Sequence, residues 1–427
     1  MHDDIRPNMP EPPKESNENT PFLTPDEAAT KDSNPEISES NPNRENTVPV
    51  NSSNPMLGKG ILDNSPPKSK KHKLWPPTKK QLIIGGSILA VILIVGGGLT
   101  YMALRHKPIT ANIPVAKAPA KPKPKPASNT VASTLTGLQV PPADNNRPIT
   151  AVMIENTTYA RPQAGLSQAG VVFEALTEGG ITRFMALFQD QLPTFVGPVR
   201  SARPYFIDWS MGFDAPYAHA GGSPQALSYI QSQKVKNLDY MYYPNYYTRI
   251  SSRPAPHNLY TNIVNLVSLE AKLGWTSSTF TGWPRKADSP SKSPNATNIN
   301  FNPSYSTYNV SYSYNAQTDS YERDEAGAAQ TDANTGQQLN PKVVIGLIVP
   351  WSQGSLDSSG AYYSTYQDIG SGKAYVFQDG TLTVGQWSKS SPTAALTFTN
   401  SAGQPLKLNA GQTWITALAD TSEISYN

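Results

Sequence analysis

Two arginines flank a serine in the segment GPVRSARPYF, residues 197–206, where the chain carries few other charges. A guanidinium group recognises carboxylates and phosphates through paired hydrogen bonds, so this spacing predicts an anion site. Further arginines and hydrogen-bonding side chains occur between residues 155 and 260. The predicted ligand-binding set from this region is Arg161, Arg183, Arg200, Ser201, Arg203 and Asn258.

A second motif, HAGGSPQA, adds backbone groups to the predicted anion site. A strand-like run ends at Gly221 and Gly222, and a helix is expected to begin at Ser223, with Pro224 as its first residue. Free amide groups at a helix start attract anions, and glycines allow a ligand to approach closely. The alternative interpretation is a tight turn and a capped helix that bind no ligand.

Acid–base chemistry is the other prediction for this region. Glu174 and Glu178 are candidate acids, and His219 and His257 are candidate bases. The alternative is a structural ion pair, with Arg183 as the cross-strand partner of Glu174. Ser201 or Ser223 beside a histidine would make a nucleophile, although only geometry decides such an arrangement. The chain has no cysteine, and only two histidines fall in the folded region, so we expect neither a metal site nor a cofactor.

Pro204 disfavours helical geometry at the residue before it, so the segment is expected to be extended at Arg203. Alternate side chains of an extended chain point to opposite sides, so Arg200 and Arg203 need not hold one ligand together. The narrower prediction places one arginine at the site and pairs the other with Glu174 or Glu178.

The elements that position these residues can be read from hydrophobic patterns. TAVMIE (150–155), VVFEAL (171–176) and ITRFMALFQ (181–189) read as strands, whereas residues 223–233 and 261–274 read as helices. These predict a mixed domain of strands and helices.

A polar linker is expected over residues 276–301, and the chain beyond it reads as β-structure. Asp379-Gly380 between two strand-like runs is the strongest hairpin signal. The tyrosine-rich segment 239–249 is expected to stack on sugars, to form a protein interface, or to pack onto its own core.

The amino-terminal part of the chain has a different composition. Residues 1–80 are rich in Pro, Asn, Ser, Glu and Lys and predict a disordered tail. Residues 82–104 carry no charge and are long enough for a transmembrane helix of roughly 34 Å. The Pro/Lys-rich segment 105–140 predicts a semi-rigid spacer. A net charge of +3 without a basic stripe gives no support for nucleic-acid binding.

The chain from about residue 138 resembles the YerB-like family of bacterial envelope proteins, a domain of unknown function found in many lipoprotein-like chains. The resemblance lies in RPITAVMIEN, ARPQAGLSQAGVVFEALTEGGITRFMALFQ, GPVRSARPYF, HAGGSPQA and APHNLY, and more loosely in the second half. There the sequence AAQTD departs from the family pattern, which carries a histidine before the aspartate. The resemblance implies an extracytoplasmic α+β domain at 141–285 and a smaller, mostly β domain at 300–427, and it implies no activity.

Together these observations predict a single-pass membrane protein with a cytoplasmic amino terminus and extracytoplasmic folded domains. Its expected ligand is an anionic or sugar-containing polymer of the cell envelope. Two alternatives stay open: an envelope hydrolase or transferase that uses Glu, His and Arg side chains, and a scaffold that recruits envelope proteins.

Overall fold

The computed structural model describes residues 129–427. The predicted tail (1–80), transmembrane helix (82–104) and spacer as far as residue 128 therefore lie outside the described residues. Within residues 129–427, no helix is long and apolar enough to cross a membrane. Few helices and many strands make up this part, which confirms the predicted α+β class.

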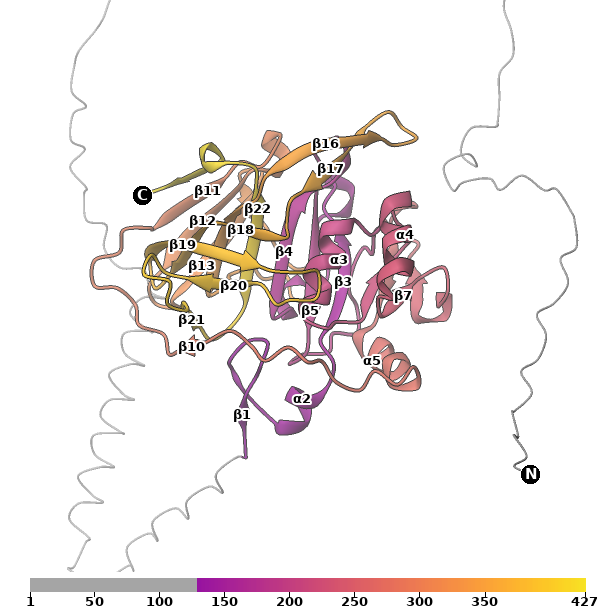
Figure 1. Cartoon of the computed structure of the whole chain (residues 1–427), viewed down its shortest axis with the longest axis horizontal. Coiled ribbons are helices and arrows are strands. Elements are labelled where there is room, and N and C mark those ends of the chain that lie inside the picture. Colours follow the sequence, from indigo (N-terminus) through magenta and orange to yellow (C-terminus); the bar gives the residue numbers. More distant parts are fainter. Residues whose placement is uncertain (1–128) are drawn as a thin grey trace, which may run out of the picture. The chain divides into compact units, whose positions relative to one another are not determined.

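A ten-stranded sheet forms the centre of the described part (Figure 1). In spatial order its strands are β20 (Thr397–Thr399), β19 (Thr381–Lys389), β18 (Gly370–Gln378), β15 (Val343–Ile348), β22 (Thr413–Leu418), β4 (Val171–Leu176), β5 (Thr182–Phe188), β3 (Thr150–Glu155), β6 (Tyr217–His219) and β7 (Asn237–Asp239). Strands β3, β4, β6, β7, β15 and β22 run in one direction, and β5 runs against its neighbours β3 and β4.

This sheet joins the two predicted domains. Strand β22, from the second half of the chain, pairs in parallel with β4 from the first half, with Thr413 opposite Val171. Both clusters of buried apolar side chains contain residues from both halves. The polar linker predicted between the halves therefore does not separate two hydrophobic cores.

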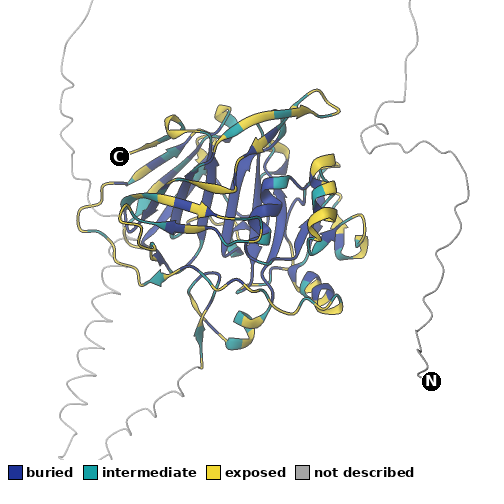
Figure 2. Cartoon of the chain, viewed as in Figure 1, coloured by how far each residue is buried: buried dark blue, intermediate teal, exposed yellow. Residues whose placement is uncertain are grey.

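Both faces of the sheet are covered, which explains why its central strands are buried along their whole length (Figure 2). On one face lie α3 (Pro204–Met211) and α4 (Pro224–Gln233), which contribute Tyr205, Phe206, Trp209 and Ile230 to one buried cluster. The opposite cluster holds the apolar face of α5 (Ile263–Lys272).

A second sheet of five strands contributes Phe301, Tyr312 and Tyr321 to the same cluster as α5. Its strands in order are β14 (Ala328–Ala329), β13 (Ser320–Glu325), β12 (Val310–Asn315), β11 (Asn298–Phe301) and β23 (Ile424–Tyr426). The hairpin of β16 (Trp351–Leu356) and β17 (Tyr362–Tyr366) extends from the central sheet as a separate ribbon (Figure 1). The small pairs are β8 (Tyr247–Arg249) with β9 (Leu259–Thr261) and β10 (Arg285–Lys286) with β21 (Leu408–Asn409).

Several local predictions are confirmed. Strands β3 and β4 have the predicted bounds, and Ser223 caps α4 by accepting a hydrogen bond from the amide of Ala226. Arg203 is extended, and α3 begins at Pro204, as proline geometry requires. Asp379 and Gly380 take positive φ angles of 56° and 72° in the turn between β18 and β19.

The predicted carboxyl-terminal boundary of the spacer, at residue 140, is wrong. Residues 131–140 form the paired strands β1 (Val131–Ala132) and β2 (Gln139–Val140), followed by the short helix α2 (Pro142–Asn146). Leu135, between the strands, is fully buried, and the Ser133 hydroxyl donates to Asp190 over 2.5 Å. The burial of Leu135 and the hydrogen bond to Asp190 hold this segment in the fold. The composition of the chain around it does not distinguish it from the spacer.

Candidate functional site

The carboxyl ends of the parallel strands meet at one edge of the central sheet, which we call the carboxyl edge. Strands β3, β4, β15 and β22 end there at Glu155, Leu176, Ile348 and Leu418. Open sheets of this kind bind ligands beyond the carboxyl ends of their strands, because the loops diverge there. A ligand site is therefore expected along this edge.

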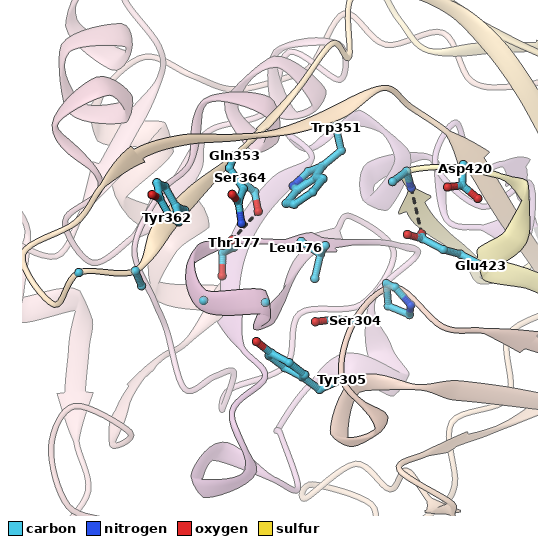
Figure 3. Close-up of a pocket in the computed structure, with 16 residues that line it drawn as sticks. Leu176, Thr177, Ser304, Tyr305, Trp351, Gln353, Tyr362, Ser364, Asp420 and Glu423 are labelled. Carbon is cyan, nitrogen blue, oxygen red and sulfur yellow. Dashed lines mark hydrogen bonds between the residues drawn. The ribbon is translucent and has the colours of Figure 1, made fainter.

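An open groove of about 850 Å³ lies at the carboxyl edge beyond β4 and β22 (Figure 3). The β16–β17 hairpin forms one wall, and residues 303–305 before β12 form another. Three aromatic side chains line it: Trp351, Tyr362 and Tyr305, with Tyr362 48% and Tyr305 67% exposed. Uncharged polar side chains lie between the aromatic ones, namely Thr177, Ser304, Gln353 and Ser364.

The charge of the groove is negative. Its lining includes Asp420 and Glu423 and contains no lysine, arginine or histidine from residues 129–427. Burial raises the pKa of Glu423 from its usual 4.5 to about 7, against the hydrogen bond that its carboxylate accepts from the Ala419 amide over 2.9 Å. The groove is therefore suited to neutral or positively charged groups.

Glycines shape the floor of the groove. Gly179 and Gly180, in the turn between β4 and β5, both have positive φ, which a side chain disfavours. A Cβ on Gly180 would lie 2.7 Å from the Ser304 hydroxyl and 2.8 Å from the Tyr305 ring. Glycine at this position keeps the floor and the Tyr305 wall in close contact.

Glu178, next to these glycines, holds two of the predicted arginines. One carboxylate oxygen pairs with Arg183 at 2.9 Å, and the other accepts from the Arg203 Nε at 2.9 Å. Arg183 also donates to the Ser201 carbonyl, which is the contact that the structure shows for that predicted residue. Burial alone would raise the pKa of Glu178, but the charges of Arg183 and Arg203 outweigh burial and hold that pKa well below its usual range. The three side chains form an internal ion-pair cluster, which we call the Glu178 cluster.

The predicted pairing of Glu174 with Arg183 is wrong. The register of β4 and β5 puts Ala175 opposite Arg183, so Glu174 points to the other face of the sheet. There its carboxylate pairs with Arg323 of β13 at 2.9 Å, and both side chains are fully buried. The guanidinium lies over the ring of Trp414 at 4.2 Å. Glu174 is therefore part of the core.

Arg161 is also engaged internally. Its guanidinium pairs with Glu325 at 2.9 Å and donates to the Asn156 side chain and the Thr307 carbonyl. Burial raises the pKa of Glu325 to about 7 despite the arginines beside it. This arrangement connects the end of β3 to the second sheet and leaves no free guanidinium for a ligand.

The predicted HAGGSPQA site is filled by the protein's own groups. The Gly221 amide donates to the Asp239 carboxylate over 3.0 Å, and its carbonyl lies 2.7 Å from His219 Nδ1. The other ring nitrogen of His219 lies 2.9 Å from the Asn237 amide oxygen, and the ring is fully buried. Gly222 forms an isolated bridge with Ala202. The interpretation as a tight turn and capped helix fits these contacts.

Two predicted residues lie together at the end of β3, and both contact Glu155. His257 Nδ1 is 2.7 Å from one oxygen of Glu155, and Arg200 Nε is 3.6 Å from the same oxygen. Glu155 is one of the polar residues between 155 and 260 for which the sequence predicts no role; a carboxylate at the end of a buried strand is the signal that points to it. The neighbouring Asn258 instead holds its own loop through Arg249 and the Ile250 carbonyl.

Most tyrosines of the tyrosine-rich segment are at least partly buried. Tyr247 is buried, and the Tyr240 ring lies edge-on to it at 5.7 Å. Among the large apolar side chains of the segment, Met241 and Tyr242 are largely exposed, at 67% and 64%. Among residues 129–427, no group of three or more His, Asp or Glu side chains could hold a metal ion.

Sequence and structure comparisons agree on the relatives of this chain. Models of the N-terminal and C-terminal domains of a family described as "Protein of unknown function (DUF3048)" match residues 135–276 and 298–415. YerB of Bacillus subtilis (strain 168), which carries the name of a lipoprotein, is 33% identical over 299 residues, covering 68% of this chain and 87% of YerB. The crystal structure of the Bacillus subtilis YerB protein matches with a TM-score of 0.62 at 30% identity, covering 70% of this chain and 99% of that one.

Proposed function

The chain belongs to the YerB-like family, whose domains have no assigned function, and we propose that it is an envelope protein whose groove binds a sugar-containing polymer. We further propose that residues 82–104 anchor it in the membrane as a single helix, with a cytoplasmic amino terminus. The uncharged length of that segment supports the anchor. The lipoprotein name of YerB is consistent with a family at the membrane surface.

The observation that carries the proposal is the combination of exposed aromatic rings and uncharged polar groups in one groove. Tyr305 and Tyr362 remain largely exposed although large apolar rings normally pack inward. Sugar rings present apolar C–H faces and a rim of hydroxyl groups. Tyrosine rings would cover the faces, and Ser304 and Gln353 would bind the hydroxyls.

The arrangement of charge favours a neutral or amine-bearing sugar over an anionic polymer. The guanidinium groups of Arg161, Arg183 and Arg203 already pair with carboxylates of the protein. The groove itself presents Asp420 and Glu423. A phosphate or carboxylate in the groove would lose its hydration without gaining a cation.

Calorimetric titration of the purified full-length protein tests the proposal. The probes are the tetramer of N-acetylglucosamine and the tetramer of glucosamine, which differ in the charge of the amino group. We expect binding of at least one tetramer and a loss of affinity of about 3- to 10-fold in Tyr362→Ala. Tyr242→Ala is the matched control, because Tyr242 is 64% exposed and lies outside the groove.

The proposal fails if neither tetramer binds. It also fails if Tyr362→Ala and Tyr242→Ala weaken binding equally, because the sugar would then contact the protein elsewhere. Binding of an anionic polymer that depended on Arg200 would restore the anion prediction in place of the groove.

A further inference from the structure

A group of three charged or titratable side chains lies at the end of β3: Glu155, His257 and Arg200. It differs from the ion pairs of Glu174, Glu178 and Glu325 in how far its nitrogen atoms are engaged by the protein. Glu155 is 1% exposed, and one of its oxygens accepts from the Thr157 hydroxyl over 2.8 Å besides contacting His257 at 2.7 Å. In the other pairs, both terminal nitrogens of each arginine donate to acceptors of the protein. Here the outer atoms of His257 and Arg200 remain available.

The tautomer of His257 follows from its partner. A carboxylate only accepts, so Nδ1 carries the hydrogen and donates it to Glu155. In the neutral ring the lone pair then lies on Nε2. No residue among 129–427 hydrogen-bonds to Nε2, and this nitrogen is not enclosed. A buried carboxylate that orients an imidazole with an open Nε2 is the arrangement of a general base.

Arg200 supplies a second group needed for catalysis, a donor that can stabilise negative charge. Its Nε lies 3.6 Å from the same Glu155 oxygen that contacts His257, so the two side chains are neighbours. The side chain is 26% exposed, and no described residue hydrogen-bonds to its two terminal nitrogens. These nitrogens are free to donate to an oxygen on which negative charge develops.

We propose that this group hydrolyses carboxylic esters, with water as the nucleophile. The chain has no cysteine, and the Thr157 hydroxyl lies on the Nδ1 side of the ring, 3.4 Å from that nitrogen. Tyr159 is 72% exposed and its ring centroid lies 5.2 Å from that of His257, so it offers an apolar surface for the ester beside the base. The ester site is separate from the sugar groove and does not depend on it.

In the reaction, Nε2 takes a proton from water while the water oxygen bonds to the ester carbonyl carbon. Arg200 donates to the carbonyl oxygen as it becomes negative, and Glu155 stays ionised and stabilises the imidazolium through Nδ1–H. The bond from the carbonyl carbon to the alcohol oxygen then breaks, and Nε2 returns its proton to that oxygen. The products are a carboxylic acid and an alcohol, and no oxidant or cofactor is consumed.

The test measures steady-state hydrolysis of p-nitrophenyl acetate and p-nitrophenyl butyrate by the purified full-length protein. We expect saturable hydrolysis, with kcat about 100-fold lower in His257→Gln and Glu155→Gln and little change in KM. Arg200→Lys should retain more activity than Arg200→Met, since lysine keeps the charge without the paired donors. Lys272→Ala removes an exposed cation on α5 and should leave the rate unchanged.

A purely structural role for His257 predicts a different outcome. Imidazole added to His257→Ala should restore hydrolysis if the ring acts as a base, whereas it would not repair a displaced loop. Thermal unfolding of each variant identifies any that fail to fold. Three results would overturn the proposal: no saturable hydrolysis, wild-type kcat in His257→Gln, or no rescue by imidazole. Cleavage of bis(p-nitrophenyl) phosphate without cleavage of the esters would overturn the ester assignment.

Discussion

The Glu178 cluster and the groove beyond β4 and β22 meet at the turn of residues 178–180, and they use their polar atoms in opposite ways. In the cluster, one carboxylate satisfies Arg183 and Arg203, and the side chains are mostly buried. In the groove, Tyr305, Gln353 and Tyr362 from distant segments stay exposed, and no cation of residues 129–427 lines it. In this turn, Glu178 belongs to the cluster, whereas Gly179 and Gly180 line the groove.

The difference shows that charged residues grouped in a sequence often form an internal ion-pair cluster and do not bind a ligand. A buried guanidinium requires a carboxylate, so the protein supplies one. An exposed tyrosine or glutamine needs no partner and can meet a ligand. The two regions should therefore respond differently to substitution: the cluster through stability, and the groove through binding.

Glu178→Ala should cause the largest loss of stability, about 3 to 5 kcal/mol, because it leaves Arg183 and Arg203 without their counter-charge. Chemical denaturation followed by circular dichroism measures it. Glu322→Ala is the control, since that glutamate makes one hydrogen bond with Asn315 near the surface and should cost less than about 1 kcal/mol. Equal losses in the two variants would show that the cluster is not a structural unit.

The substitutions Gly180→Ala and Gly179→Ala test how two neighbouring glycines of the turn contribute to the groove. Both glycines have positive φ, so each alanine should cost about 1 to 2 kcal/mol from backbone strain. The Gly180 methyl would clash with the groove wall at Ser304 and Tyr305, whereas a Gly179 methyl would make an ordinary contact with the Ala361 Cβ at 3.6 Å. Unfolding free energies and the oligosaccharide titration should therefore show a further loss, in both stability and affinity, in Gly180→Ala alone. Identical binding by the two variants would contradict the assigned groove wall.

Local structure was largely predictable from the sequence, because it depends on neighbouring residues. The bounds of β3 and β4, the Ser223 cap and the Asp379-Gly380 turn all follow from local patterns. The pairing of β22 with β4 joins Val171 to Thr413, 242 positions away, and has no local signal. It could not be derived from patterns within either strand.

The site was less predictable for the same reason. The predicted histidines and glutamates share no cleft: Glu174 and His219 are core residues, whereas His257 contacts a glutamate 102 positions away. The groove residues Tyr305, Trp351 and Tyr362 are ordinary members of a tyrosine- and serine-rich region. Only the fold distinguishes them, because it brings them together at the carboxyl edge and leaves the Tyr305 and Tyr362 rings exposed.

The two regions should also differ in pH dependence. Glu178 has a lowered pKa, so its contribution is present above its unfolded value near 4.5 and is lost as the pH falls below it. Glu423 has a pKa raised to about 7, so its contribution is complete below pH 4.5 and is lost as the pH rises through 7. Because Glu423 is partly exposed, we expect less than about 1 kcal/mol from it.

Thermal unfolding of wild type and Glu423→Gln between pH 5 and pH 8 measures this contribution. The wild type should lose more stability over this range than the variant, although Glu270, Glu325 and Asp368, whose pKa values are also raised to about 7, keep part of the dependence in both. A steeper loss in the variant would contradict the assigned sign.

Tyr305→Ala should have the smallest effect on stability and so separates the two regions most sharply. The ring is 67% exposed, so its removal should change the free energy of unfolding by no more than about 0.5 kcal/mol. Because the same ring forms a wall of the groove, affinity for the bound tetramer should still fall about 3- to 10-fold. A large loss of stability would mean that Tyr305 supports the turn at Gly180 as Glu178 does. Unchanged stability with weakened binding would place the ring in the ligand site.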